Sequence, residues 1–443
     1  METDRSLLED MLLDGNLNKA YLQVVRNKGA EGIDGMKYTE LKDYLIEHGE
    51  EIKEQIRTRK YEPKPVRRVE IPKENGKVRK LGIPTVLDRF VQQAIVQVLT
   101  PIYEPVFSET SYGFRPNRCC EMAIMKALEY MNDGFQWVVD IDLENFFDNV
   151  SHDKLITLVM RKVKDGEIVS LIRKFLKSGI MMDDEYEESV IGTPQGGNLS
   201  PLLSNIMLNE LDKELESRGL RFTRYADDCI ILVGSSKAAD RVIASITRYI
   251  EKKLGLKVNM TKSKVSKPND IKYLGFGFFR DSCDGLWKAR PHEKSVNKLM
   301  VKLKKLTLRS WGVSMEHRIS RINEVLRGWF RYYRIGYFKN VCRRVDRNIR
   351  FRLRMCIWKQ WKKTRTRYRN LLKLGLPQWK AITWANSRKS YARCASTFLQ
   401  VAIPNSLFER KFKHRYCLFT KEELNTIFND CVNYIIKEII KLG

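Results

Sequence analysis

The sequence predicts an α+β protein, on three observations. The first 60 of its 443 residues carry apolar side chains at helical spacing. From Tyr61 to about residue 285, short runs rich in β-branched and aromatic residues alternate with helical patterns. Beyond about residue 290 the pattern is helical again and strongly basic. A chain of this length has material for two or three domains and a sizeable core.

The composition points to a nucleic-acid partner. Lys and Arg number 81 against 54 Asp and Glu, a net charge of +27. An excess of this size favours a polyanion over a membrane surface, and no apolar run is long enough to span a bilayer. The N-terminus lacks a signal-peptide pattern. The nine cysteines are scattered without a C-x-x-C pair, so we expect no zinc ribbon or disulfide framework and a cytoplasmic location.

The N-terminal part begins with two predicted helices. Leu8, Met11 and Leu12 share an apolar face of the first, and Val24 lies on the second. The segment 27–35 that follows is a loop with three glycines, which permit close backbone approach. A plain connection between helices is the simplest interpretation of that loop.

The next stretch changes to strands. Val66–Pro72 alternates, Asn75-Gly76 is a strong turn signal, and Val78–Ile83 returns as a second strand. Lys73 and Arg79 flank the turn, so both cations could face one anion, although an exposed basic hairpin is the alternative. A helix then runs over 85–99 and is expected to end at Pro101.

Segment 111–118 combines two arginines with two aromatic residues, a mixture that suits stacking and backbone contacts with nucleic acid. A helix over 123–131 follows. The run 137–142 is then a short buried strand that ends in acid, with Asp140 and Asp142 on one face.

The most informative turn is Tyr225-Ala226-Asp227-Asp228, which lies between two apolar runs. Strand, two-acid turn and strand predict a β-hairpin with carboxylates at its tip. A solvated surface turn is the alternative for these residues alone. A strand that brings Asp142 to this tip would assemble three carboxylates, enough for two Mg²⁺ ions in an in-line phosphoryl transfer.

The remaining elements complete the α+β pattern. We expect helices over 152–177, 238–254 and much of the chain beyond 290, a short hairpin within 178–190, and a strand at 256–258. A Gly-Gly loop within 193–205 opens a helix to about residue 218, and 273–278 is a hairpin candidate. Between Lys339 and Arg369 there are thirteen basic residues and one acid, Asp346, which favours RNA binding over a mixed-charge surface.

Three segments occur in a fixed order: Asp142-x-x-x-Phe146-Phe147, then Thr193–Asn205, then Tyr225–Asp228. They resemble the ordered motifs of reverse transcriptases. The whole chain resembles small bacterial group II intron-encoded reverse transcriptase/maturases that lack an endonuclease domain. The resemblance covers roughly residues 15–360, and 326–336 is similar to the maturase or thumb region.

This resemblance implies a right-hand polymerase. The N-terminal extension would be 1–60, and its 27–35 loop would contact the template near the primer end. The fingers and the palm, with its antiparallel sheet, would be 61–285. The helical thumb or maturase domain would be 286–375, and a reduced DNA-binding tail 376–443, with no endonuclease domain.

The resemblance also assigns site residues. Asp142 lies four residues before Phe146, as the family's metal-binding Asp does, whereas Asp140 does not fit. Asp142, Asp227 and Asp228, with the Leu143 carbonyl, would hold two Mg²⁺ ions, for which Mn²⁺ can substitute. The residues expected to bind the dNTP are Lys73, Arg79, Phe146 as steric gate against a 2′-hydroxyl, Gln195 and Lys262, with Lys264 as an alternative to the last. The residues expected at the template or primer are Arg115, Asn117, Gly196, Tyr225, Leu274 and Gly275.

The function implied is an RNA-directed DNA polymerase that copies intron RNA and, as a maturase, assists its splicing. Its partners would be group II intron RNA, an RNA template with a DNA primer, dNTPs and target DNA; a homodimer is compatible with the resemblance. Three alternatives stay open: a splicing factor without an active polymerase, an RNA-dependent RNA polymerase, and a reverse transcriptase of a defence system.

Overall fold

The computed structural model describes residues 6–405 except 73–75, 77, 183–184, 188–190 and 194–195. Expectations on Lys73, Gln195 and residues 406–443 therefore lie outside the described residues. The chain divides into two compact units, Met1–Pro268 and Asn269–Gly443, and each is described by itself. The expected palm boundary at 285 differs from this division, which assigns 269–285 to the second unit.

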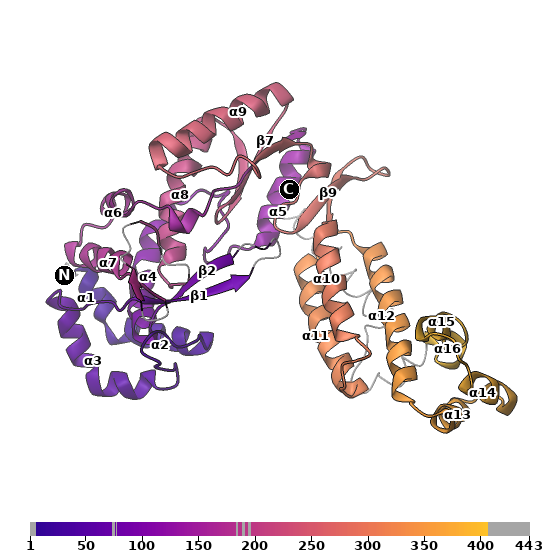
Figure 1. Ribbon diagram of the computed structural model, residues 1–443. Coiled ribbons are helices and arrows are strands. Elements are labelled where there is room, and N and C mark those ends of the chain that lie inside the picture. The colour runs from indigo at the N-terminus through magenta and orange to yellow at the C-terminus, as the bar shows by residue number, and fades with distance from the viewer. Residues whose placement is uncertain are drawn as a thin grey trace. The chain divides into compact units, whose positions relative to one another are not determined.

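The first unit begins with helices, as the periodicity predicts. α1 (Leu7–Leu12) and α2 (Asp14–Asn27) pack on α4 (Val86–Tyr103), and α3 (Leu41–Arg57) completes the group (Figure 1). The expected end of α4 at Pro101 is wrong, because the helix continues to Tyr103. A proline removes one backbone hydrogen bond, and the buried Tyr103, whose hydroxyl donates to the Val159 carbonyl at 3.0 Å, keeps the last turn in place.

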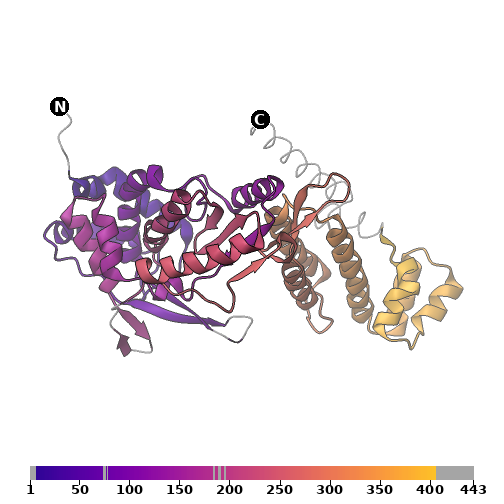
Figure 2. The same cartoon turned by 90° about the horizontal axis from the view of Figure 1, so that it is seen from above.

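The hairpin predicted around Asn75-Gly76 is confirmed in its two strands. β1 (Val66–Pro72) and β2 (Val78–Ile83) pair antiparallel, with Pro72 opposite Val78. β4 (Ile180–Met182) joins β1 in parallel at the end far from the turn, and β5 (Glu185–Glu187) pairs with β4. Figure 2 shows β1 and β2 as a long hairpin with the two short strands beside its base.

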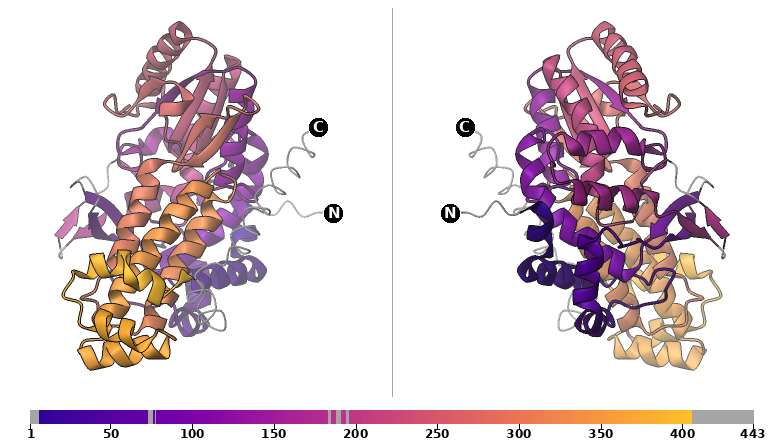
Figure 3. Two further views of the ribbon diagram at one scale, coloured as in Figure 1. Left: turned by 90° about the vertical axis from the view of Figure 1, so that its right-hand side faces the viewer. Right: turned by 90° about the vertical axis from the view of Figure 1, so that its left-hand side faces the viewer.

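A second sheet of four antiparallel strands organises the rest of the first unit. The strand order is β6 (Arg221–Tyr225), β7 (Asp228–Val233), β3 (Trp137–Ile141) and β8 (Lys264–Ser266). Helices α5 (Cys120–Asn132), α8 (Ser200–Ser217) and α9 (Ser236–Tyr249) contact this sheet, and α9 continues as a π-turn to Leu254 (Figure 3). β3 and β7 lie in the middle of the sheet, so their apolar side chains are buried on both faces.

Two local expectations in this unit need correction. The helix expected over 152–177 is two helices, α6 (His152–Met160) and α7 (Gly166–Lys177), because Asp165 caps the second by accepting the N–H groups of Glu167 and Ile168. Residues 256–258 form only an isolated bridge, between Val258 and Leu143.

Up to residue 405, where the described part of the chain ends, the second unit consists of one hairpin followed by helices. The hairpin pairs β9 (Phe276–Arg280) with β10 (Trp287–Pro291), and Tyr273–Phe276 is a tight turn before it rather than a complete hairpin. The helices are α10 (Glu293–Leu306), α11 (Met315–Tyr333), α12 (Lys339–Gln360), α13 (Thr364–Lys373), α14 (Gln378–Ala385), α15 (Tyr391–Ser396) and α16 (Phe398–Ala402).

Aromatic residues form much of the core of this second unit. Phe330, Tyr333 and Phe338 are buried, while Tyr332 and Tyr337 are partly exposed. The mixed helix and sheet content confirms the α+β class. Among the residues that the structure describes, none of the helices is both long and apolar enough to cross a membrane.

Candidate active site

The acidic turn has the predicted hairpin geometry. Tyr225 pairs with Asp228, so Ala226 and Asp227 are the two turn residues between β6 and β7. Ala226 has a φ of +57°, whereas Asp227 does not lie in the positive-φ region. Positive φ at the first central residue alone is typical of a type II′ turn, where glycine is usual. An alanine there stores strain of about 1–2 kcal/mol, which the surrounding structure must hold.

The sheet register brings Asp142 to this turn. Ile141, the last residue of β3, lies opposite Cys229 of β7, so Asp142 follows beside Asp228. Ser263 and Asn259 fix its backbone: the Asp142 N–H donates to Ser263 Oγ at 3.0 Å, and its carbonyl accepts the Asn259 N–H at 2.8 Å. The acidic residues expected to work together therefore come from adjacent strand ends.

A cation already faces the Asp142 carboxylate. Lys262 Nζ lies 3.1 and 3.2 Å from its two oxygens. Within the described parts of the chain, no three or more His, Cys, Asp or Glu side chains converge to hold a metal ion. Mg²⁺, however, needs only one or two carboxylates together with waters and substrate phosphates. The hard oxygen donors at the two strand ends fit such an ion.

The structure separates two lysines that the sequence left as alternatives. Lys262 contacts Asp142, whereas Lys264 in β8 pairs with Asp140 in β3 and lowers the pKa of that carboxyl. Burial has the larger and opposite effect, and it raises the pKa of Asp140 to about 6. Asp140 therefore differs from Asp142 in environment as well as in position.

Phe146 lies deep in the core of the first unit. Its side chain is 2% exposed, and the ring of Phe147 meets it edge-on with centroids 5.2 Å apart. Asn145 adopts a φ of +44° just before them. The Phe147 carbonyl accepts the Thr193 N–H at 2.7 Å, so this segment is tied to the start of the Gly-Gly loop. A steric-gate role for Phe146 stays a prediction.

The two glycines of that loop approach protein rather than open space. Gly196 has a φ of +126°, and a Cβ there would lie 2.5 Å from the Gly82 carbonyl oxygen of β2. A Cβ on Gly197 would lie 2.7 Å from Oε1 of Gln92 in α4. Both glycines let the loop dock against these neighbouring elements, a packing reason that the sequence did not show.

Arg115 differs from its expected role. We expected it along the template, but its side chain is 2% exposed and pairs with Glu104 at 2.8 Å. It also donates to the carbonyls of Ser108 and Ser111. With these donors occupied and buried, Arg115 stabilises the loop from within. Asn117, at a φ of +58°, and Phe114, which is 52% exposed, lie on the accessible side of the same loop.

The other predicted residues are placed as follows. Leu143 is buried and bridges to Val258, and Tyr225 is half-buried in β6. Leu274 and Gly275 belong to the second unit, where the Leu274 carbonyl accepts the Tyr332 hydroxyl at 2.8 Å. The backbone of Arg79 lies in β2 opposite Ile71, but its side chain is outside the described residues, as are Lys73 and Gln195.

Comparisons with known proteins match two family models to this chain. The model of the reverse transcriptase (RNA-dependent DNA polymerase) family matches residues 71–278, and that of the group II intron maturase-specific domain matches 296–375. Protein YkfC of Escherichia coli is 35% identical over 284 residues, 55% of this chain and 74% of that protein. The group II intron-encoded protein LtrA of Lactococcus lactis is 41% identical over 212 residues.

The match to LtrA covers 48% of this chain and 35% of LtrA. Among solved structures, a partial Cas6-RT-Cas1–Cas2 complex is 24% identical with a TM-score of 0.37, covering 56% of this chain and 43% of that one. The family models and the extent of the match to YkfC carry the assignment. The chain belongs to the family of group II intron-encoded reverse transcriptases, RNA-directed DNA polymerases that use divalent metal ions and carry a maturase-specific domain.

Proposed function

We propose that Asp142, Asp227 and Asp228 form the polymerase centre, which extends a DNA primer on an RNA template with dNTPs. The observation that carries this proposal is the register of β3, β7 and β6, which sets Asp142 beside the acidic turn. Two Mg²⁺ ions, when bound there, would lower the pKa of the primer 3′-hydroxyl and neutralise the departing pyrophosphate. Mn²⁺ is expected to substitute for Mg²⁺.

The protein's own residues would position the reactants. The three carboxylates, with the Leu143 carbonyl, supply oxygen ligands at the end of the sheet. Lys262, now 3.1 Å from Asp142, would turn to the leaving phosphates once a metal neutralises that carboxylate. We assign Lys73, Arg79 and Gln195 to the incoming dNTP and Phe146 to exclusion of its 2′-hydroxyl, on family resemblance.

The second unit would hold the RNA. Its maturase-specific segment, 296–375, is rich in Lys and Arg and poor in acids. We propose that it binds the parent intron RNA during splicing and grips template during copying, with 1–60 as an extension and 61–285 as fingers and palm. Target DNA would contact residues after 376. The protein would act in the cytoplasm, together with its nucleic-acid partners. A homodimer is compatible with this function.

The test is primer extension on an RNA template with dNTPs and Mg²⁺. Asp227→Ala should reduce incorporation by about 10³-fold or more, because it removes a ligand at the centre of the reaction. Asp133→Ala, an exposed acid at the end of α5, is the matched control and should extend normally. RNA affinity should be equal in both variants.

Normal extension by Asp227→Ala would disprove the assignment of the centre. If the unmodified protein bound structured RNA tightly but extended no primer, the splicing-factor alternative would replace the polymerase proposal.

A further inference from the structure

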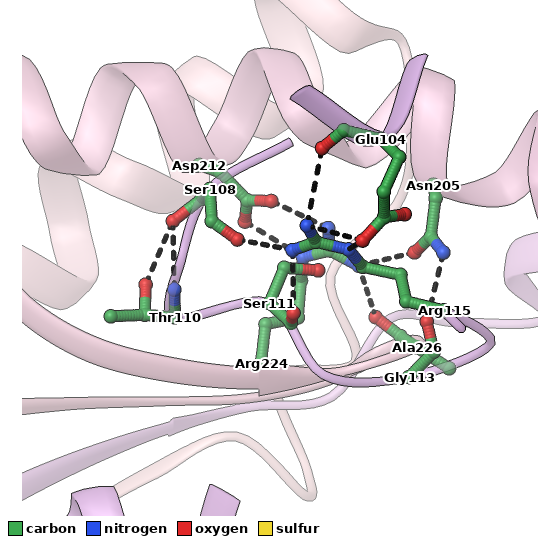
Figure 4. A network of polar contacts seen from close by, with 10 residues as sticks. All are labelled: Glu104, Ser108, Thr110, Ser111, Gly113, Arg115, Asn205, Asp212, Arg224 and Ala226. Carbon is green, nitrogen blue, oxygen red and sulfur yellow. Dashed lines mark hydrogen bonds and ion pairs between the residues drawn. The ribbon is translucent and has the colours of Figure 1, made fainter. Parts of the chain in front are cut away.

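A buried arginine lies directly beneath the acidic turn. Arg224, one residue before Tyr225 in β6, is 1% exposed, and its partner Asp212 in α8 is fully buried. The pair is bidentate, with Nε 2.7 Å from Oδ1 and Nη2 2.5 Å from Oδ2 (Figure 4). Such a fork fixes the plane of the guanidinium as well as its position.

The remaining edge of this guanidinium points to the turn. Arg224 Nη1 donates to the Ala226 carbonyl at 2.9 Å and to Asn205 Oδ1 at 3.0 Å. Ala226 is the turn residue with the positive φ, and the next two residues are Asp227 and Asp228. Arg224 thus connects helix α8 to the strained peptide that precedes the acids.

The same network reaches the loop that contains Gly113. Asn205 Nδ2 donates to the Gly113 carbonyl at 2.8 Å, and a Cβ on Gly113 would lie only 2.2 Å from the Ala226 nitrogen. The Arg224 backbone pairs with this loop as well: its N–H donates to the Thr110 carbonyl and its carbonyl accepts the Tyr112 N–H, both at 2.9 Å. The loop and the turn are therefore held against each other.

Stability alone does not explain a charged pair at this place. Burying two charges is costly, and well-packed apolar residues of similar volume are often as stable. An apolar pair, however, could not donate to the Ala226 carbonyl or orient the Asn205 amide. The bidentate pair orients the guanidinium, and the guanidinium in turn orients the turn. The turn needs a fixed orientation because its carboxylates must keep a defined position.

We propose that Arg224 is a positioning residue of the polymerase centre: with Asp212 and Asn205, it fixes the Ala226 carbonyl, and through it Asp227 and Asp228, against the loop at Gly113. This inference rests on the proposed function of the three aspartates. It gives the network a role in metal binding and in the rate of nucleotide addition, apart from its contribution to folding.

Two variants separate positioning from folding. Asp212→Leu with Arg224→Met removes both charges together, and Arg224→Lys keeps the charge opposite Asp212 but loses the fork. Both should unfold close to the unmodified protein in thermal melts. Each should lower kcat for single-nucleotide addition at least tenfold and raise the Mg²⁺ concentration for half-maximal rate, with KM for dNTP changed less than about threefold.

A second readout does not require catalysis. Mn²⁺ titration followed by electron paramagnetic resonance, without nucleic acid, should show weaker binding in both variants, and the Asp227→Ala protein sets the level of a lost site. A folded double variant with unchanged kcat and Mn²⁺ affinity would overturn the positioning role. If the unmodified protein itself neither extends primers nor binds Mn²⁺, the proposed function fails instead.

Discussion

The two units of this chain differ sharply in charge. Residues 1–268 contain 41 Lys and Arg against 42 Asp and Glu, whereas residues 269–443 contain 40 against 12. The first unit therefore has a net charge of −1 and the second +28, which together give the +27 of the chain. An average over the chain points correctly to a polyanionic partner, but it conceals which unit attracts that partner.

The N-terminal helices, like the first unit as a whole, have no excess of basic residues. Residues 1–60 hold 13 acidic and 10 basic residues, so long-range attraction of RNA to this segment has no support in its net charge. Contacts of the 27–35 loop with template, if made, depend on local geometry. In the proposed function, the basic residues of the second unit would supply the electrostatic part of RNA binding.

Charged side chains differ between the units in number more than in burial, since the second unit also has buried arginines, such as Arg318 and Arg350. In the first unit, Arg115 and Arg224 are buried with the acids Glu104 and Asp212 and have fixed directions. In the second, residues 347–405 contain fifteen Lys and Arg and no acid. Chemistry should therefore depend on individual residues of the first unit, and RNA binding on many residues of the second.

The largest expected effect concerns two tryptophans of the second unit. Trp358 is 1% exposed and packs on Trp361 and Phe398, so Trp358→Ala should cost about 3–5 kcal/mol of unfolding free energy. Trp379 is 67% exposed in α14 beside Lys380, so Trp379→Ala should change stability by less than about 0.5 kcal/mol.

Denaturant unfolding measures both variants, and RNA binding separates them further. A base stacked on Trp379 would be worth about 1–3 kcal/mol. Unchanged RNA affinity in Trp379→Ala would restrict the role of the second unit's surface to its charges.

The next prediction tests whether catalysis depends on individual residues of the first unit. Lys262→Ala should lower kcat about 100-fold, because its ammonium lies 3.1 Å from Asp142 and, in the proposed function, would stabilise the departing phosphates. Lys264→Ala, the matched control, should lower it less than about threefold, since Lys264 faces Asp140. Pre-steady-state incorporation measures both, and equal losses would contradict the separation seen in the structure.

The sequence predicts correctly those structures that a few neighbouring residues determine. The β6–β7 turn is one, because two acids between apolar runs fit a hairpin tip, and the β1–β2 hairpin is another. Asp142 could be placed as well, since its strand is short, apolar and ends in acid. These predictions hold because a few neighbouring residues determine each structure.

Features that depend on distant partners escaped prediction. β8 has three residues next to basic ones, and it becomes a strand only because β3 offers it an edge. Pro101 suggests a helix end, but tertiary packing of Tyr103 overrides that preference. In the sequence, Arg224 only interrupts an apolar run. Its role becomes visible through its ion pair with Asp212, which lies in α8.

A third effect tests whether RNA binding is distributed. Lys362, Lys363 and Arg365 are exposed at the start of α13, and replacing all three with Ala should weaken RNA binding and reduce the salt dependence. Loss of up to three phosphate contacts would make the slope of log K against log salt less steep by about 2. Lys237, Arg241 and Lys252, exposed in the first unit, provide the control triple variant, whose slope should not change.

Equal changes in the two triple variants would contradict the division of charge between the units. Filter binding at several salt concentrations is sufficient for the comparison.

The smallest effect concerns pH and the first unit alone. Burial lowers the pKa of His152, whose Nε2 lies 2.6 Å from the Gly192 carbonyl. A lowered pKa means that the folded state binds fewer protons than the unfolded chain, so stability is complete above the unfolded pKa of about 6.5 and declines as pH falls below it. The loss approaches about 1.4 kcal/mol for each unit of the shift.

His152→Gln should therefore flatten the decline in urea midpoint between pH 7.5 and 5.5, while His48→Gln, at a histidine with a 37% exposed side chain, should not. An equally steep decline in His152→Gln would assign the acid sensitivity to other groups.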